Sequence, residues 1–312
     1  MSGGGAYAGP SIFHVGYIKT GTTYLQDEVF SKPTLGMSLA GGAMSRAHLI
    51  DWFVVNDDYL YDPDAVRAKL TGLERDARAT GLAPVWSDET LIGNPLMRSY
   101  HGTVVMRKIA ALGIPAKVIV TVREQRAFVL SAYREFVKHG ETQSLESFIG
   151  TGREGKSYTP IMREDFLNFD IVVQAWMEAF GADNVLVLPQ ELLRDDRDAY
   201  LERLGWLLGG GRRLEAADVH RNKGAGATSL LARVWLNRFY VRTPLTQRRS
   251  FAEKAVHKIG RAVDRLAPRR LDRLLERRLS ATVAARYGGR FDESNRRLEA
   301  LTGLNLRALG YQ

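Results

Sequence analysis

The chain has 312 residues, enough for one large domain or two small ones, with 45% hydrophobic and 25% charged residues, as in soluble globular proteins. It has no cysteine, which excludes disulfides, thiolate nucleophiles and cysteine-ligated metals. The net charge is +9, but residues 233–290 alone carry +12, from 14 Arg and 2 Lys against 2 Asp and 2 Glu, which leaves −3 elsewhere.

The N-terminus shows neither a basic start nor an apolar stretch, so it does not resemble a signal peptide. No apolar run approaches the roughly 20 residues that a membrane-spanning helix needs. We therefore expect a cytoplasmic protein, with peripheral contact at a membrane surface as one interpretation of the basic segment.

Short apolar runs alternate with helical patterns along the first two thirds of the chain. Strands are predicted at 11–15, 84–87, 116–122 and 184–188. Helices are predicted at 22–30, 62–80, 103–112, 125–139, 165–180 and 198–208, and a glycine-rich loop at 36–42. This alternation predicts an α/β fold in which a parallel sheet has helices on both faces and binds ligands at the carboxyl ends of its strands. Gly16, Asp88 and Arg123 follow such ends.

The first predicted strand leads into a loop that reads Gly-Tyr-Ile-Lys-Thr-Gly-Thr-Thr from residue 16 to residue 23. A strand, a turn bounded by glycines and a helix start direct backbone N–H groups toward one spot, where they can bind an anion. Lys19 adds a positive charge there, and Thr20, Gly21, Thr22 and Thr23 complete the predicted phosphate site. The alternative is a structural turn with a solvated lysine.

The loop is not a Walker A motif, in which the lysine follows the second glycine. Here Thr22 follows Gly21, and Lys19 stands inside the loop. The third predicted strand ends at Arg123, and Ser131 comes eight residues later, about two helical turns on. A guanidinium, a hydroxyl and a helix N-terminus together suit a dianionic phosphate.

The lysine inside the loop, followed by Thr-Thr-Tyr-Leu-Gln, resembles the 5′-phosphosulfate-binding loop of the sulfotransferases that use 3′-phosphoadenosine 5′-phosphosulfate (PAPS). In that family an arginine after a strand and a serine eight residues later bind the 3′-phosphate, and Arg123 and Ser131 match in type and spacing. The family often has proline before the lysine, where this chain has Ile18. The stretch from His220 to Gly224, which includes Lys223, loosely resembles the loop that closes over the nucleotide.

Residues 291–311 are similar to the end of bacterial members, so the resemblance, which is to bacterial, carbohydrate-sulfotransferase-like proteins, spans most of the chain. It implies a three-layer fold like that of the P-loop nucleotide kinases, in a single sulfotransferase domain over 1–312 that includes a basic helical segment at about 228–290. It also implies sulfuryl transfer from PAPS, with PAP as product and no metal. The expected acceptor is a hydroxyl or amine on a glycan, a glycolipid or another small molecule.

Sulfuryl transfer needs a cation at the bridging oxygen and a base for the acceptor proton. Lys19 is the predicted cation. Family members carry a histidine or a glutamate as base near the end of the second predicted strand, where this chain has Asp88 and Glu89. We take Glu89 as the base and Asp88 as the second choice, the alternative being that Glu89 only caps a turn. His48 and His101 are weaker candidates.

The basic segment admits three interpretations: a solvated helical face, a membrane-surface helix, or a site for an anionic acceptor. It contains no nucleic-acid-binding motif, so no nucleic-acid partner is expected. Two other functions stay open for the whole chain. One is a P-loop kinase that uses ATP and Mg²⁺, and the other is a non-catalytic protein that binds membranes or polyanions.

Overall fold

The computed structural model describes residues 5–209, 214–215, 226–240 and 250–312. The chain packs as two compact units. The first comprises 1–124, 168–219 and 293–311, and the second comprises 125–167, 220–292 and residue 312.

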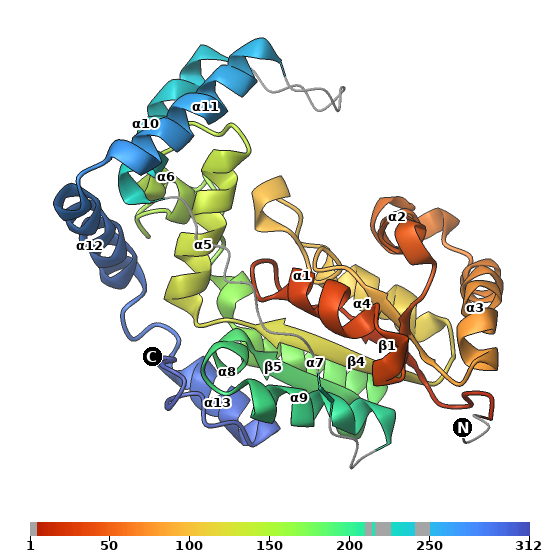
Figure 1. The fold of residues 1–312 in the computed structure, drawn as a ribbon. Helices are drawn as coiled ribbons and strands as arrows, with labels where there is room; N and C mark the ends of the chain where they lie inside the picture. The colour runs from red at the N-terminus through yellow and green to blue at the C-terminus, as the bar shows by residue number, and fades with distance from the viewer. Residues whose placement is uncertain (1–4, 210–213, 216–225, 241–249) are drawn as a thin grey trace. The chain divides into compact units, whose positions relative to one another are not determined.

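The first unit is built on a parallel sheet of five strands in the order β2-β3-β1-β4-β5 (Figure 1). The strands are β1 Ser11–His14, β2 Met37–Leu39, β3 Ala83–Ser87, β4 Ala116–Val122 and β5 Val185–Pro189. The predicted strands correspond to β1, β3, β4 and β5, to within a residue at either end. The prediction of a loop at 36–42 is wrong for β2, a three-residue edge strand too short to show a period in the sequence.

The helices of this unit connect and cover the strands. The longer ones are α2 Ser45–Leu49, α3 Pro63–Ala79, α4 Gly102–Ala111, α7 Phe169–Phe180, α8 Gln190–Asp195, α9 Arg197–Gly205 and α13 Asp292–Thr302. The predicted helix at 22–30 is a short α-helical turn, α1 Thr22–Tyr24, continued by the π-helix η1 Leu25–Phe30. A second π-helix, η4 Ile50–Val55, continues α2. The 3₁₀ turns are η2 Pro33–Leu35, η3 Gly42–Met44, η5 Asp58–Leu60, η6 Pro95–Met97, η8 Ala182–Asn184 and η9 Trp206–Leu208.

Helices cover both faces of the sheet. On one face, Ile12, Val85, Ile119 and Leu188 of the strands join the buried side chains of α1, η1, α8 and α9 in a single hydrophobic cluster. On the other face, α7 packs on β4 and β5, and α4 packs on α7. On that face too, Trp86 of β3 donates from its indole nitrogen to Glu74 of α3 at 2.8 Å. The predicted three-layer architecture is confirmed.

The C-terminal helix α13 is fixed to the sheet's covering layer through one buried carboxylate. Asp170, near the start of α7, is 3% exposed and accepts hydrogen bonds from Ser294 and Arg297 of α13. A carboxylate with two donors is satisfied in a buried position. The end of the chain is therefore part of the first unit's core.

The second unit is helical. Its elements are α5 Gln125–Lys138, α6 Leu145–Ile149, η7 Asp165–Leu167, α10 Ala227–Leu236, η10 Asn237–Phe239, α11 Phe251–Leu266 and α12 Arg269–Tyr287. Helix α5 packs against α6, α10 and α12, and α11 packs on α10 and η10 (Figure 1). Arg134 of α5 pairs with Glu276 of α12 at 2.5 Å.

The predicted helical character of the basic segment is confirmed in its described part. A break falls at Pro268, which precedes α12, as expected for a residue that cannot continue a helix. In the part of the chain that the structure describes, each helix is too short or too polar to cross a bilayer.

Candidate functional site

Beyond the end of β1, the first residues of the loop remain hydrogen-bonded to β4. The Val15 N–H donates to the Ile119 carbonyl oxygen and the Tyr17 N–H to the Thr121 carbonyl oxygen, each at 2.9 Å. Between them, Gly16 lies so close to β4 that a Cβ atom there would stand 2.6 Å from the Thr121 backbone nitrogen. Only glycine fits this approach, so the start of the loop is set by backbone contact rather than by a flexible turn.

A methyl group at residue 16 should therefore disrupt the start of the loop. We expect Gly16→Ala to lower the free energy of unfolding by about 2 kcal/mol or more, because the backbone of β4 cannot yield without breaking sheet hydrogen bonds. Gly72→Ala is the matched control, because a Cβ atom on Gly72 in α3 meets open space. That change should stabilise the helix by up to about 1 kcal/mol. Equal effects of the two changes in urea unfolding would contradict the close approach at Gly16.

The turn of the loop contains two residues in the left-handed region, Lys19 with φ 61° and Gly21 with φ 95°. For a lysine this conformation is uncommon and has to be held by its surroundings. The Thr20 hydroxyl donates to the Tyr17 carbonyl oxygen at 2.5 Å, and Arg123 donates to the Lys19 carbonyl oxygen at 3.2 Å. These bonds fix the turn although Ile18 stands where the resembling family often has proline.

A chain of hydrogen bonds behind the loop has one consistent direction. The Tyr17 carbonyl oxygen can only accept, so the Thr20 hydroxyl donates to it. The Thr121 hydroxyl, whose oxygen lies 2.7 Å from that of Thr20, must then donate to Thr20. His14 Nε2, 3.1 Å from the Thr121 hydroxyl, must then donate, and its Nδ1 accepts from Ser87 at 2.7 Å. Burial lowers the pKa of His14 to about 3, which agrees with the neutral ring that this network requires.

The helix that follows the loop begins with two threonines of different exposure. Thr23 is exposed, whereas Thr22 is 6% exposed and its hydroxyl has no hydrogen-bond partner among the described residues. A buried hydroxyl without a partner is costly, and at a helix N-terminus an anionic oxygen would satisfy it. The loop thus fits the phosphosulfate end of PAPS: Thr22 offers a hydroxyl and Lys19 an exposed ammonium group, while the Thr20 hydroxyl is used inside the loop.

The two carboxylates after β3 lie in different surroundings. Asp88 is fully buried and accepts from the Thr90 N–H at 2.7 Å and the Thr90 hydroxyl at 2.5 Å. Its other oxygen lies 2.9 Å from Nε of Arg46, an ion pair that approaches outside the hydrogen-bond direction. Asp88 is therefore held as a structural group, which makes it the poorer candidate for a base.

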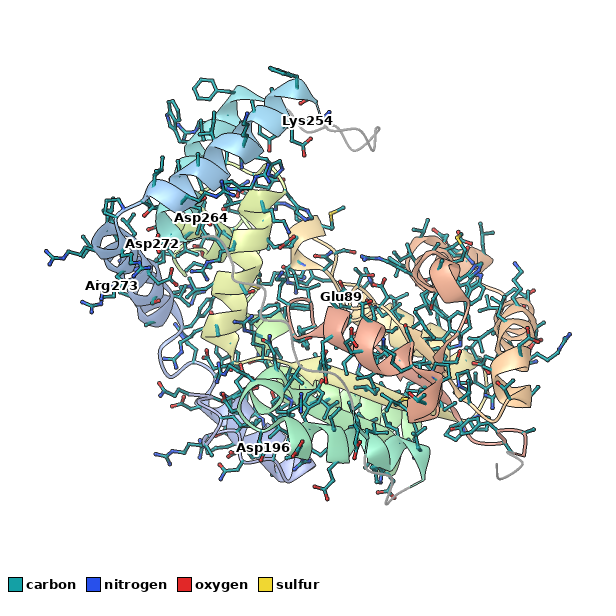
Figure 2. All side chains as sticks on the ribbon, viewed as in Figure 1. Glu89, Asp196, Lys254, Asp264, Asp272 and Arg273 are labelled. Atoms are coloured by element: carbon teal, nitrogen blue, oxygen red, sulfur yellow. The ribbon has the colours of Figure 1, made fainter. Side chains whose placement is uncertain are left out.

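Glu89, in the turn after β3, is only partly buried (Figure 2). Burial raises the pKa of Glu89, the neighbouring charge of Asp88 raises it further, and the charges of Arg46 and Lys19 oppose the shift. Lys19 and Glu89 follow the carboxyl ends of the neighbouring parallel strands β1 and β3. The structure places the predicted cation and the predicted base at the same end of the sheet.

The two histidines considered as alternative bases differ in the contacts that their rings make. His101 meets the Ser99 hydroxyl at 2.5 Å through Nδ1 and the Thr90 carbonyl oxygen at 2.8 Å through Nε2. Both ring nitrogens are used, so His101 supports the turn next to Glu89. His48 stacks on Trp52, with the ring centroids 5.1 Å apart.

Arg46 is a site residue that the sequence reasoning missed. It lies in α2, a helix that was not predicted. It forms an ion pair with Asp88, and its charge opposes the rise in the pKa of Glu89. No local pattern marks it, because its partners lie more than forty residues away in the sequence. A helix predicted over residues 45–55, which the sequence analysis did not propose, would have drawn attention to it.

The remaining predicted nucleotide residues are divided between the two units. Arg123 directly follows β4 in the first unit, and Ser131 lies within α5 in the second, as the spacing predicted. Their joint binding of one phosphate stays a prediction. Lys223 and the rest of the predicted closing loop lie outside the described residues.

The backbone that follows Arg123 is bonded to a carboxylate that also contacts the C-terminus of the chain. The buried Glu191, in α8, accepts from the N–H of Glu124 at 3.1 Å and from the Tyr311 hydroxyl at 3.0 Å. Burial raises the pKa of Glu191, and these hydrogen bonds oppose the shift. The sequence pattern at the C-terminus resembled bacterial members but did not reveal this contact.

The Tyr311 hydroxyl should matter for stability. We expect Tyr311→Phe to lower the free energy of unfolding by about 1–3 kcal/mol, because it removes a hydrogen bond to the buried Glu191 carboxylate. Tyr59→Phe is the control, since Tyr59 is 98% exposed. An unchanged denaturation midpoint for Tyr311→Phe would show that the contact contributes nothing.

A comparison with solved structures identifies the fold. The structure is similar to that of a sulfotransferase from Alicyclobacillus acidocaldarius, with a TM-score of 0.50 and 16% identity over 97% of this chain and 99% of that one. The five-stranded parallel sheet between helices is accordingly the P-loop-like fold of sulfotransferases.

Two further solved structures match at lower scores. Mouse sulfotransferase SULT7A1 complexed with PAP has a TM-score of 0.34 and 15% identity, over 88% of this chain and 91% of that one. The sulfotransferase domain of the Synechococcus olefin synthase has a TM-score of 0.35 and 16% identity, over 89% and 96%. No protein-family model and no curated protein matches the sequence.

Proposed function

We propose that this protein is a sulfotransferase that moves a sulfuryl group from PAPS to a hydroxyl or amine of an acceptor and releases PAP. The observation that carries the proposal is the loop after β1, where Lys19 stands inside the turn, at the same end of the sheet as Glu89 after the neighbouring strand β3. The buried Thr22 hydroxyl without a partner supports an anionic ligand at the same loop.

Lys19 and Glu89 have different roles in the proposed reaction. Lys19 stabilises the negative charge that develops on the phosphate oxygen as the sulfur–oxygen bond to it breaks. Glu89, as a carboxylate, accepts the proton of the attacking acceptor while the new bond to sulfur forms. PAPS supplies the activated sulfuryl group, and the protein's part is positioning and electrostatics, as in phosphoryl transfer.

The rest of the donor site is part of the same proposal. Backbone N–H groups of residues 20–23 hold the 5′ end, and Arg123, Ser131 and Lys223 hold the 3′-phosphate. We propose that the two units serve one catalytic domain, which needs no metal. We also propose that the protein is cytoplasmic.

For the acceptor, we propose a glycan, a glycolipid or another small hydroxylated molecule. The test is transfer of label from sulfur-labelled PAPS to a panel of sugars, glycolipids, phenols and alkyl amines. Label on sugars or glycolipids, lost in Glu89→Gln, is the expected result. Label confined to alkyl amines would overturn the acceptor class and retain the donor. Label confined to phenols would retain a hydroxylated acceptor and exclude a glycan or glycolipid.

A further inference from the structure

Helix α11, in the second unit, has an exposed apolar stripe. Phe251 is 88%, Ile259 46% and Leu266 82% exposed, and Ala255 and Ala262 lie between them on the same side. Spacings of four, eight, eleven and fifteen residues from Phe251 keep these side chains on one helix face. This face is separate from the side that packs on α10, where Val256 and Gly260 are buried.

A stripe of cations runs beside the apolar one. Lys254, Lys258, Arg261 and Arg265 are all exposed and follow one another at intervals of four, three and four residues (Figure 2, Lys254). Such intervals place the four charges on one side of the helix. The helix thus presents two parallel stripes to solvent, one apolar and one basic.

The acidic residues of α11 do not neutralise this surface. Glu253 is buried on the α10 side, where it lies 3.7 Å from His257. Asp264 accepts from the Gly226 N–H at the start of α10 at 2.8 Å (Figure 2). Glu253 is thus buried, and Asp264, although exposed, is engaged with α10, so four exposed cations of the helix stand against one exposed carboxylate.

We propose that α11 lies in the interface of a membrane that contains anionic lipids. Phe251 and Leu266 enter the boundary between headgroups and acyl chains, and the four cations meet the lipid phosphates beside them. A soluble polyanion would satisfy the cations but leave the apolar stripe in water. A second copy of the same face would bring two basic stripes together, which like-charge repulsion opposes. The inference does not depend on the proposed transferase activity.

The test uses the full chain and vesicles of phosphatidylcholine with or without phosphatidylglycerol. We expect co-sedimentation with the anionic vesicles, weak binding to the neutral ones and a loss of binding as salt is added. Lys258→Gln with Arg265→Gln should weaken binding about 25-fold, at about fivefold for each cation. Phe251→Gln and Leu266→Gln should each weaken it about tenfold through the lost apolar contact.

The matched controls lie in α3, which also has exposed cations and an exposed leucine. Lys69→Gln with Arg75→Gln, and separately Leu73→Gln, should leave vesicle binding unchanged. All these positions are exposed, and circular dichroism checks that each variant is folded. The proposal is overturned if the protein does not bind anionic vesicles, or if α11 and α3 variants lose binding equally. It is also overturned if the α11 changes abolish self-association and not vesicle binding.

Discussion

Lys19→Ala should reduce the rate of sulfuryl transfer about 10²–10³-fold. In the proposed mechanism the Lys19 ammonium group stabilises the charge that develops on the leaving phosphate, and this substitution removes that stabilisation. The change in kcat should exceed the change in affinity for PAP, since the charge at this oxygen is greatest in the transition state. Both quantities come from steady-state kinetics and calorimetry on the same preparation.

The controls separate charge from conformation. Lys32→Ala removes an exposed cation that lies just beyond the end of η1 and pairs with Glu28 of that helix, and it should leave transfer unchanged. Lys19→Gly restores freedom in the left-handed region without restoring charge, and should stay as slow as Lys19→Ala. Near-normal rates in either Lys19 variant would remove this residue from the mechanism.

Glu89→Gln should lower kcat about 10²–10⁴-fold while the affinity for PAP stays close to that of the unchanged protein. Glutamine keeps the shape of the side chain but cannot accept the acceptor proton. Glu28→Gln is the control, because Glu28 is a surface carboxylate of the helix after the loop. Equal turnover of Glu89→Gln and the control would exclude Glu89 as the base.

The pH dependence of transfer tests the same residue in a second way. The base works only when ionised, so the rate should fall as pH decreases through its pKa. Burial, with the help of the Asp88 charge, raises the pKa of Glu89, so the acid limb of kcat/KM should lie above the ordinary value of 4.5. Glu89→Gln should lose that limb. A limb that persists in this variant would assign the ionisation to another group.

The parts of the fold that could be predicted from sequence share a local cause. The strand at Ala116–Val122 is a β-branched apolar run, and Asp62-Pro63 begins a helix in which Asp62 caps the Asp64 and Ala65 N–H groups. The loop with Lys19 belongs to the same class, because strand, turn and helix start follow one another directly. Each of these features is decided by neighbours within a few residues.

The features that the sequence did not reveal depend on distant partners. Arg46 meets Asp88 across forty-two positions, and Tyr311 meets Glu191 across one hundred and twenty. The edge strand β2 exists because β3 offers it a ladder, since its three residues carry no period of their own. Such contacts follow from the folded topology, and one sequence gives no signal for them.

The loop after β1 is the centre of this account, and nucleotide binding tests it most directly. Calorimetric titration should show that adenosine 3′,5′-bisphosphate binds tightly without metal, more tightly than ATP with Mg²⁺, and that Lys19→Ala weakens this binding only moderately. A preference for ATP with Mg²⁺ would contradict the account in favour of a kinase. Binding of neither nucleotide would contradict it in favour of a non-catalytic protein that binds membranes or polyanions.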